Sequence, residues 1–320
     1  LVQPGRVSEA CPVIPPRAAG TAGPVLTVVV VAYGMTRELP RTLASLSPRY
    51  QRDIATTEYE VIVVDNGSPD PLDRIIRDAE VDVRLIRLDP APASPARAAN
   101  VGVEAAAGSL VGVIMDGARM ASPGLLNMAR LGARLADRPV VTAPAYHLGP
   151  TTHMRAVEVG YDQAVEDALL EAVSWEDDGY RLLGCSTLAG SSHRGWFGAM
   201  SESSSLFMER DLWQELGGYF EAFDLPGGGL VNHDLYLRAC EREDTTLVQL
   251  LAEGTFHQIH GGAATSRRFG WAEMAAQYEA LRGRSFRELE VDPIHVGRIP
   301  GAALEMMDLS VRSALARRSG

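Results

Sequence analysis

The sequence of 320 residues contains no lysine, so all 30 of its basic residues are arginines. This absence excludes chemistry that depends on a lysine amine: a Schiff base, a lysine general base, or the lysine of a phosphate-binding P-loop. The 41 acidic residues bring the formal net charge to -11. A general nucleic-acid binder needs a basic stripe, so we expect no nucleic-acid partner.

Cysteines are also scarce. Cys11, Cys185 and Cys240 lie far apart and form no C-x-x-C pair, which argues against a disulfide framework or a zinc site and favours a reducing compartment. There is no apolar run of membrane-spanning length and no signal-peptide pattern. We therefore expect a cytoplasmic protein, with its arginine-rich end (311–320) as a candidate contact to a membrane surface.

What the sequence does contain is an alternation of buried strands and helices. The segment 1–23 is rich in Pro, Ala and Gly and is typical of a flexible tail. Continuous apolar runs predict strands at 25–33, 59–65, 81–89 and 110–116, and helical patterns fall at 36–47, 94–108, 122–137, 270–283 and 300–318. This order predicts an α/β fold with a mostly parallel sheet covered by helices.

Polar residues follow three of these predicted strands: Ala32-Tyr33, Asp65-Asn66 and Asp116. Ligands of parallel sheets bind beyond the carboxyl ends of the strands, so these positions predict a site. Asp116 has two interpretations. Its carboxylate either caps the turn into Gly117 or faces a ligand.

Five segments, in order, resemble the family 2 glycosyltransferases of the GT-A fold. They include "YEVIVVDNGSPD", "ARAANVGVEAAAGSLVGVIMDGA", "ELGGYFEAF" and "HDLYLRA", and the similarity runs from about Leu26 to Gly262. We therefore expect a Rossmann-like GT-A domain over 24–265, preceded by the tail and followed by a C-terminal helical extension over 266–320.

The resemblance implies transfer of a sugar from a nucleotide-diphosphate sugar, UDP or dTDP, to an acceptor hydroxyl on a glycan, a lipid-linked molecule or a small molecule. An inverting, metal-assisted reaction is expected. By the resemblance, Asp65 binds the base and Ala32 and Tyr33 line the base and ribose pocket. The nucleotide-sugar residues implied further along the chain are Arg97, Asn100, Asp116 and Glu202, with Arg97 replacing the motif arginine that is Ala99 here.

The expected cofactor is a divalent cation, Mn²⁺ or Mg²⁺. Asp116 matches the first acid of the family's D-x-D motif, and Ala118 stands in place of the second. The segment "TFHQIHGGAATS" resembles the late histidine motif of such enzymes. If "TFHQIH" is one strand, His257 and His260 point to opposite faces and only one reaches the site; the resemblance favours His260 as the metal ligand.

An inverting transfer also needs a carboxylate that takes the proton of the acceptor hydroxyl. "HDLYLRA" retains Asp234, Leu235 and Arg238 of the family motif, whereas its preceding acids have become Val231 and Asn232. Asp234 is therefore predicted as the catalytic base. The alternative is a structural acid at a helix N-terminus, favoured by the helix dipole.

Two other functions stay open. The incomplete D-x-D motif is compatible with a non-catalytic protein that only binds nucleotide sugars. A sugar nucleotidyltransferase shares the sheet but normally has a glycine-rich loop with lysine, which this chain lacks. A homodimer through the apolar faces of the C-terminal helices is a further expectation.

Overall fold

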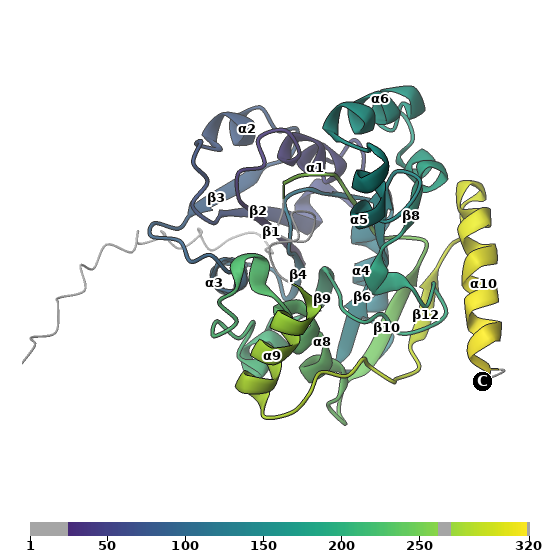
Figure 1. Cartoon of the computed structure of the whole chain (residues 1–320). Coiled ribbons are helices and arrows are strands. Elements are labelled where there is room, and N and C mark those ends of the chain that lie inside the picture. The colour runs from purple at the N-terminus through teal and green to yellow at the C-terminus, as the bar shows by residue number, and fades with distance from the viewer. Residues whose placement is uncertain (1–24, 262–269, 319–320) are drawn as a thin grey trace, which may run out of the picture.

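The computed structural model describes residues 25–261 and 270–318. The predicted tail at 1–23 lies outside these residues. An eight-stranded sheet runs through the centre of the molecule (Figure 1), in the spatial order β12-β10-β6-β9-β4-β1-β2-β3. Its strands are β1 (Leu26–Ala32), β2 (Tyr59–Asp65), β3 (Val83–Arg87), β4 (Leu110–Ile114), β6 (Pro139–Thr142), β9 (Ser205–Glu209), β10 (Thr246–Leu251) and β12 (Ile294–Gly297).

The sheet is mainly parallel, as predicted, and β9 is antiparallel to both of its neighbours. All seven residues of β1 are buried. Side chains alternate along a strand, so Val29 and Val31 pack into the core on one face, and Val28 and Val30 into the core on the other. A strand covered on both faces explains the continuous β-branched run in the sequence.

Helices cover both faces of this sheet (Figure 1). They are α1 (Leu39–Ser45), α2 (Asp73–Arg77), α3 (Ala96–Glu104), α4 (Leu125–Gly132), α7 (Arg210–Leu216), α8 (Val231–Cys240) and α9 (Trp271–Arg282). α10 (Leu304–Arg318) lies at the edge of the molecule near β12. Among the described residues, no helix is both long and apolar enough to cross a bilayer.

A second, four-stranded sheet packs beside the first and has the order β5-β11-β7-β8. Its strands are β5 (Arg119–Ala121), β7 (Ala145–Leu148), β8 (Ser186–Leu188) and β11 (Thr255–His257). The short helices α5 (His153–Ala156) and α6 (Gln163–Val173) lie between β7 and β8 in the chain. Because β5 follows β4 almost directly, this small sheet begins at the carboxyl end of the central one.

Two details differ from the sequence-based expectation. The helix expected from Ser122 begins at Leu125, because the Ser122 hydroxyl donates a hydrogen bond to the buried Glu253 carboxylate instead of capping a helix. The region 266–320 contains the two expected helices, α9 and α10, but it also supplies β12 to the central sheet, next to β10.

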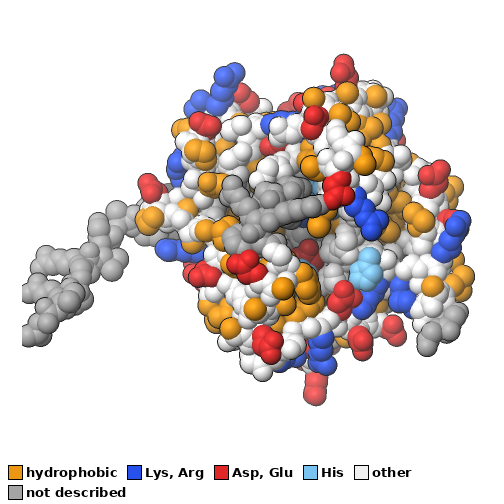
Figure 2. Space-filling view, in the orientation of Figure 1, with side chains coloured by type: hydrophobic (Ala, Val, Ile, Leu, Met, Phe, Trp, Pro, Cys, Tyr) orange, Lys and Arg blue, Asp and Glu red, His pale blue; other side chains and the backbone are white. Residues whose placement is uncertain are grey.

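The surface agrees with the acidic composition. Acidic and arginine side chains are interspersed over the face shown in Figure 2, and the arginines visible there form no continuous stripe. Apolar side chains are spread between them. This face therefore offers no continuous basic surface to the phosphates of a nucleic acid.

Close packing between β4 and β9 gives the first testable prediction. A Cβ atom at Gly112 would lie 2.2 Å from ring carbons of Phe207, its partner across the two strands. We expect Gly112→Ala to destabilise the protein by about 1–3 kcal/mol through overpacking. Gly184→Ala is the matched control, because a Cβ there meets nothing within 4 Å. Equal melting temperatures for the two variants would contradict this account of the packing.

Candidate active site

Asp116 lies in the turn between β4 and β5, and its two carboxylate oxygens have different partners. Oδ1 accepts a hydrogen bond from the backbone N–H of Ala118 at 2.9 Å. Oδ2 faces His257 and His260, whose Nε2 atoms lie 3.0 Å and 3.2 Å away. The structure thus shows the turn cap through one oxygen, while the other oxygen faces a cluster of side chains. That Asp116 faces a ligand stays a prediction.

Both histidines reach Asp116, so the expectation that only one of them could do so is wrong. The reason is that β11 ends at His257, and alternation between faces ends with it. Beyond His257, the Gln258 N–H donates to the carbonyl oxygen of Ala118, and the Ile259 N–H donates to the Glu166 carboxylate. The chain bends, and the Nε2 atoms of His257 and His260 come within 3.0 Å of each other.

The charges in this cluster depend on one another. Burial would raise the pKa of the Asp116 carboxyl, but the adjacent His260 and His257 hold it well below its usual range. Burial and the nearby Arg119 lower the pKa of His257 to about 3. Burial also acts against the charged form of His260, yet Asp116 raises its pKa above the ordinary value. The site therefore contains an ionised carboxylate and a neutral His257 at neutral pH.

These three side chains have the donor set of a divalent-cation site. One carboxylate oxygen and two imidazole nitrogens lie within 4.8 Å of one another. Manganese accepts both oxygen and imidazole ligands, and a deprotonated carboxylate with unprotonated histidines is the state that binds a metal. His257 was not among the residues predicted as ligands. The presence of two histidines in "TFHQIH" was the available signal.

Asp65 lies at the end of β2 beside Ala32 at the end of β1, as the parallel register of the two strands requires. Asp65 is fully buried, and its Oδ1 accepts a hydrogen bond from the Ser68 N–H at 2.8 Å. Its Oδ2 accepts no hydrogen bond from the described residues, although Arg87 lies 3.5 Å away. Tyr33 is 60% exposed. Oδ2 of Asp65 thus forms an ion pair with Arg87 but accepts no hydrogen bond, and the exposed Tyr33 directly follows Ala32, the register partner of Asp65.

The helix α3 carries Asn100 and Arg97, and their surroundings differ. The Asn100 amide donates to the Tyr219 carbonyl at 2.9 Å and accepts from the Tyr219 N–H at 2.8 Å. It also donates to Glu221. Asn100 therefore fixes the turn after α7, and its polar atoms are already used by the protein. Arg97 is exposed and makes no hydrogen bond with the residues that the structure describes.

Asp234, the predicted base, is 1% exposed and lies between two arginines. Its carboxylate accepts from Arg282 at 2.5 and 2.7 Å and from Arg238 at 2.9 Å. A general base must contact the hydroxyl that it deprotonates. A buried carboxylate with guanidinium partners on both oxygens does not meet this requirement. The geometry instead supports the structural alternative, an acid that ties α8 to α9.

Glu202, in contrast, is partly exposed. It lies shortly before β9, which pairs with β4, and the antiparallel pairing continues one residue past β4, where the Met115 N–H donates to the Ser204 carbonyl. The Glu202 carboxylate lies 3.5 Å from Nδ1 of His233 on α8.

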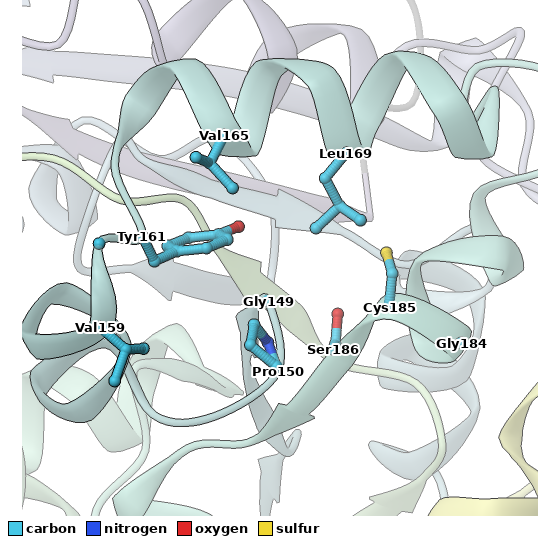
Figure 3. Close-up of a pocket in the computed structure, with 10 residues that line it drawn as sticks. Gly149, Pro150, Val159, Tyr161, Val165, Leu169, Gly184, Cys185 and Ser186 are labelled. Atoms are coloured by element: carbon cyan, nitrogen blue, oxygen red, sulfur yellow. The ribbon is translucent and has the colours of Figure 1, made fainter.

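A cavity of about 610 Å³ lies between α6 and the β7–β8 strands (Figure 3). Tyr161, Val165 and Leu169 line one side of it, and Cys185 and Ser186 line the other. None of the predicted site residues lines this cavity. It is mostly apolar, so we do not assign the chemistry to it.

Comparison with known proteins identifies the fold and a matching segment. Residues 27–125 match the family model described as glycosyl transferase family 2. The fold of the chain is the GT-A fold of solved glycosyltransferase structures. The family match includes Asp65 and Asp116 and ends before the two histidines. A search of curated proteins gives no match to this chain.

Solved structures of glycosyltransferases resemble most of the chain. Staphylococcus aureus TarS 1–349 in complex with UDP-GlcNAc is 14% identical, with a TM-score of 0.53, and the match covers 90% of this chain and 71% of that one. The mannosyltransferase PcManGT from Pyrobaculum calidifontis, in complex with GDP-Man and Mn²⁺, is 15% identical, with a TM-score of 0.51 and coverages of 94% and 77%.

Glucosyl-3-phosphoglycerate synthase from Mycobacterium tuberculosis, in complex with Mn²⁺, UDP and phosphoglyceric acid, is 17% identical, with a TM-score of 0.50 and coverages of 81% and 78%. In two other TarS structures this chain spans only 60% and 42% of the TarS chain. At these identities the likeness establishes the fold.

Glu166 on α6 holds the histidine segment in place and gives a pH-dependent prediction. Burial raises its pKa from the ordinary 4.5 to about 7, although the Ile259 N–H and Arg37 favour the ionised form. The folded state therefore binds more protons than the unfolded state between these values. Stability should fall as pH rises from about 4.5 to 7, by up to about 3 kcal/mol.

Denaturant unfolding across this pH range tests the effect. Glu166→Gln keeps an acceptor for the Ile259 N–H and removes the titration, so it should flatten the slope. Glu171→Gln, at an exposed position of the same helix, is the matched control and should keep the wild-type slope. An unchanged slope in Glu166→Gln would show that another group produces it.

Proposed function

We propose that this protein transfers a sugar from a nucleotide-diphosphate sugar to an acceptor hydroxyl, assisted by a divalent cation held by Asp116, His257 and His260. The observation that carries the proposal is the meeting of three ligand atoms at the carboxyl end of β4. One of them belongs to Asp116, which lies in the segment that matches family 2. This partly buried cluster offers a full set of cation ligands although the D-x-D motif is incomplete. That favours the enzyme over the non-catalytic alternative.

The proposed donor carries uracil or thymine. Oδ2 of Asp65 is a buried acceptor that receives no hydrogen bond from the described residues, and both bases present an N3–H that such an acceptor can bind. The exposed Tyr33 directly follows Ala32, the register partner of Asp65, and would contact the base or ribose. Two of the similar structures contain UDP or UDP-GlcNAc, which agrees with this choice, whereas PcManGT contains GDP-Man.

A bound cation, Mn²⁺ or Mg²⁺, would supply positive charge opposite the negative charge that develops on the leaving diphosphate. The chain contributes the Asp116 carboxylate and the two imidazoles that hold this ion. The exposed Arg97 at the start of α3 is proposed as a second positive charge for the diphosphate. Arginine is the one strongly basic side chain that this sequence provides.

Glu202 replaces Asp234 as the proposed base. In an inverting transfer, the acceptor oxygen attacks C1 of the sugar while the bond from C1 to the phosphate oxygen breaks. The electron pair of that bond stays on the diphosphate, and the hydroxyl proton passes to the base. Glu202 is partly exposed and precedes β9, the neighbour of β4, and His233 lies near enough to interact with its carboxylate. The acceptor is a hydroxyl compound of unassigned structure.

Location and assembly remain predictions. A cytoplasmic protein is expected from the composition, and a homodimer from the exposed apolar side chains of α10, among them Leu304 and Leu309.

The metal site is tested by calorimetric titration of Mn²⁺ with UDP or dTDP present. Wild type should bind the ion and the nucleotide together. Asp116→Asn and His260→Gln should weaken Mn²⁺ binding by at least about 100-fold, because a lost ligand costs more than the outer-shell changes that already cost 10–100-fold. His193→Gln, at a half-exposed histidine elsewhere in the chain, is the control. Equal Mn²⁺ affinity in all four proteins would refute the site.

The base is tested by nucleoside diphosphate release from nucleotide sugars, with water or a glycan panel as the acceptor. Glu202→Gln should lower kcat by about 10²–10⁴-fold and leave nucleotide affinity unchanged. Asp234→Asn should instead lower the melting temperature, because it removes the charged partner that two partly buried arginines share. A large loss of kcat in Asp234→Asn at an unchanged melting temperature would restore Asp234 as the base.

A further inference from the structure

Three side chains form one row across the small sheet, on neighbouring strands. His257 of β11 pairs directly with Arg119 of β5 on one side and with His147 of β7 on the other. Residues that pair directly across strands point to the same face of a sheet. Arg119, His257 and His147 therefore share the face on which His257 meets Asp116.

Each member of this row has a side-chain nitrogen without a hydrogen-bond partner among the described residues. Nε and Nη1 of Arg119 are buried and make no hydrogen bond, and Nδ1 of His257 has no partner either. When Nε2 of His257 binds a cation, the proton of the neutral ring lies on Nδ1. Nδ1 of His147 accepts from the His153 N–H at 2.9 Å, so Nε2 carries the proton of the neutral ring. A buried donor without an acceptor costs about 1–3 kcal/mol, and more when it is charged.

A second cation is the first explanation to consider, because ligand atoms of His147, His153 and His257 lie within 4.8 Å of one another. Two observations oppose it. The rings of His147 and His153 stack, with centroids 4.2 Å apart and an angle of 17° between their planes, so one ion cannot lie in the plane of both. The guanidinium of Arg119 lies beside the same histidines and would repel a cation.

Donors without acceptors and a positive charge are instead what an oxyanion requires. We propose that Arg119, His257 and His147 form a binding site for a phosphate group of the substrate, next to the metal ligands. This inference rests on the proposed function. The phosphate belongs either to the leaving diphosphate of the donor or to a phosphorylated acceptor, and the two sources share the same chemistry.

The sequence around Asp116 supports such a site. Ala118 stands where the family motif has its second acid, and Arg119 follows it. With a cation bound, a single carboxylate and a guanidinium leave this end of β4 with surplus positive charge. A phosphate or diphosphate group would neutralise it. Arg119 and His147 are both partly exposed.

The test compares wild type with Arg119→Gln and with Arg155→Gln, which removes the same charge from an exposed position on α5. Each protein is titrated with UDP and with UMP in the presence of Mn²⁺. It is then titrated with inorganic phosphate when saturated with UDP. Inorganic pyrophosphate serves as a probe that contains no nucleoside.

If the donor supplies the phosphate, Arg119→Gln should bind UDP and pyrophosphate at least about tenfold more weakly and bind UMP normally. If the acceptor supplies it, Arg119→Gln should bind UDP normally, and the wild-type complex with UDP should bind phosphate that the variant does not. Arg155→Gln should behave as wild type throughout. Equal affinity of Arg119→Gln and wild type for all of these probes would overturn the inference.

Stability provides a second readout. If Arg119 were a structural residue, Arg119→Gln would lower the melting temperature of the ligand-free protein. A ligand-binding role predicts an equal or higher value, because two buried guanidinium nitrogens without acceptors are removed. A wild-type protein that binds no nucleotide but binds pyrophosphate through Arg119 would refute the proposed function and leave this inference standing.

Discussion

The pairing of β5 with β11 is the constraint on which the candidate site depends. It joins residues more than 130 positions apart, and it continues beyond β11 through the hydrogen bond from the Gln258 N–H to the Ala118 carbonyl. Through this pairing, the turn that carries Asp116 lies against the segment that carries the two histidines. Glu166 on α6 fixes the same segment from the other side through the Ile259 N–H. The cluster is thus assembled by backbone contacts, and the side chains need little reorganisation to meet.

The central sheet could be predicted from the sequence because its strands are buried on both faces. A run such as "VLTVVVVAY" has no other common interpretation at that length. Asp65 and Asp116 could be placed for the same reason, because each follows such a run. The strands of the small sheet are three or four residues long, too short for periodicity to reveal them. The position of His257 therefore depended on where one short strand ends, which the sequence does not show.

Asp234 illustrates a different limit of prediction from sequence. Its motif suggested catalysis, but its role follows from Arg282, which lies 48 residues further along the chain and on another helix. Long-range ion pairs of this kind leave no local pattern in a sequence. Because the chain has no lysine, every ion pair of a carboxylate with a basic side chain other than histidine involves an arginine. Arg37 spans Glu38, Glu166 and Asp167 in this way, whereas Arg119 has no carboxylate partner among the described residues.

The central claim is that Asp116, His257 and His260 bind one divalent cation. The most direct test is a crystal structure of the protein with Mn²⁺ and UDP, using anomalous scattering to locate the metal. The account predicts one manganese bonded to Oδ2 of Asp116 and Nε2 of both histidines, with the diphosphate against it. A metal bound elsewhere, or a diphosphate held in this site with no metal beside it, would contradict the account.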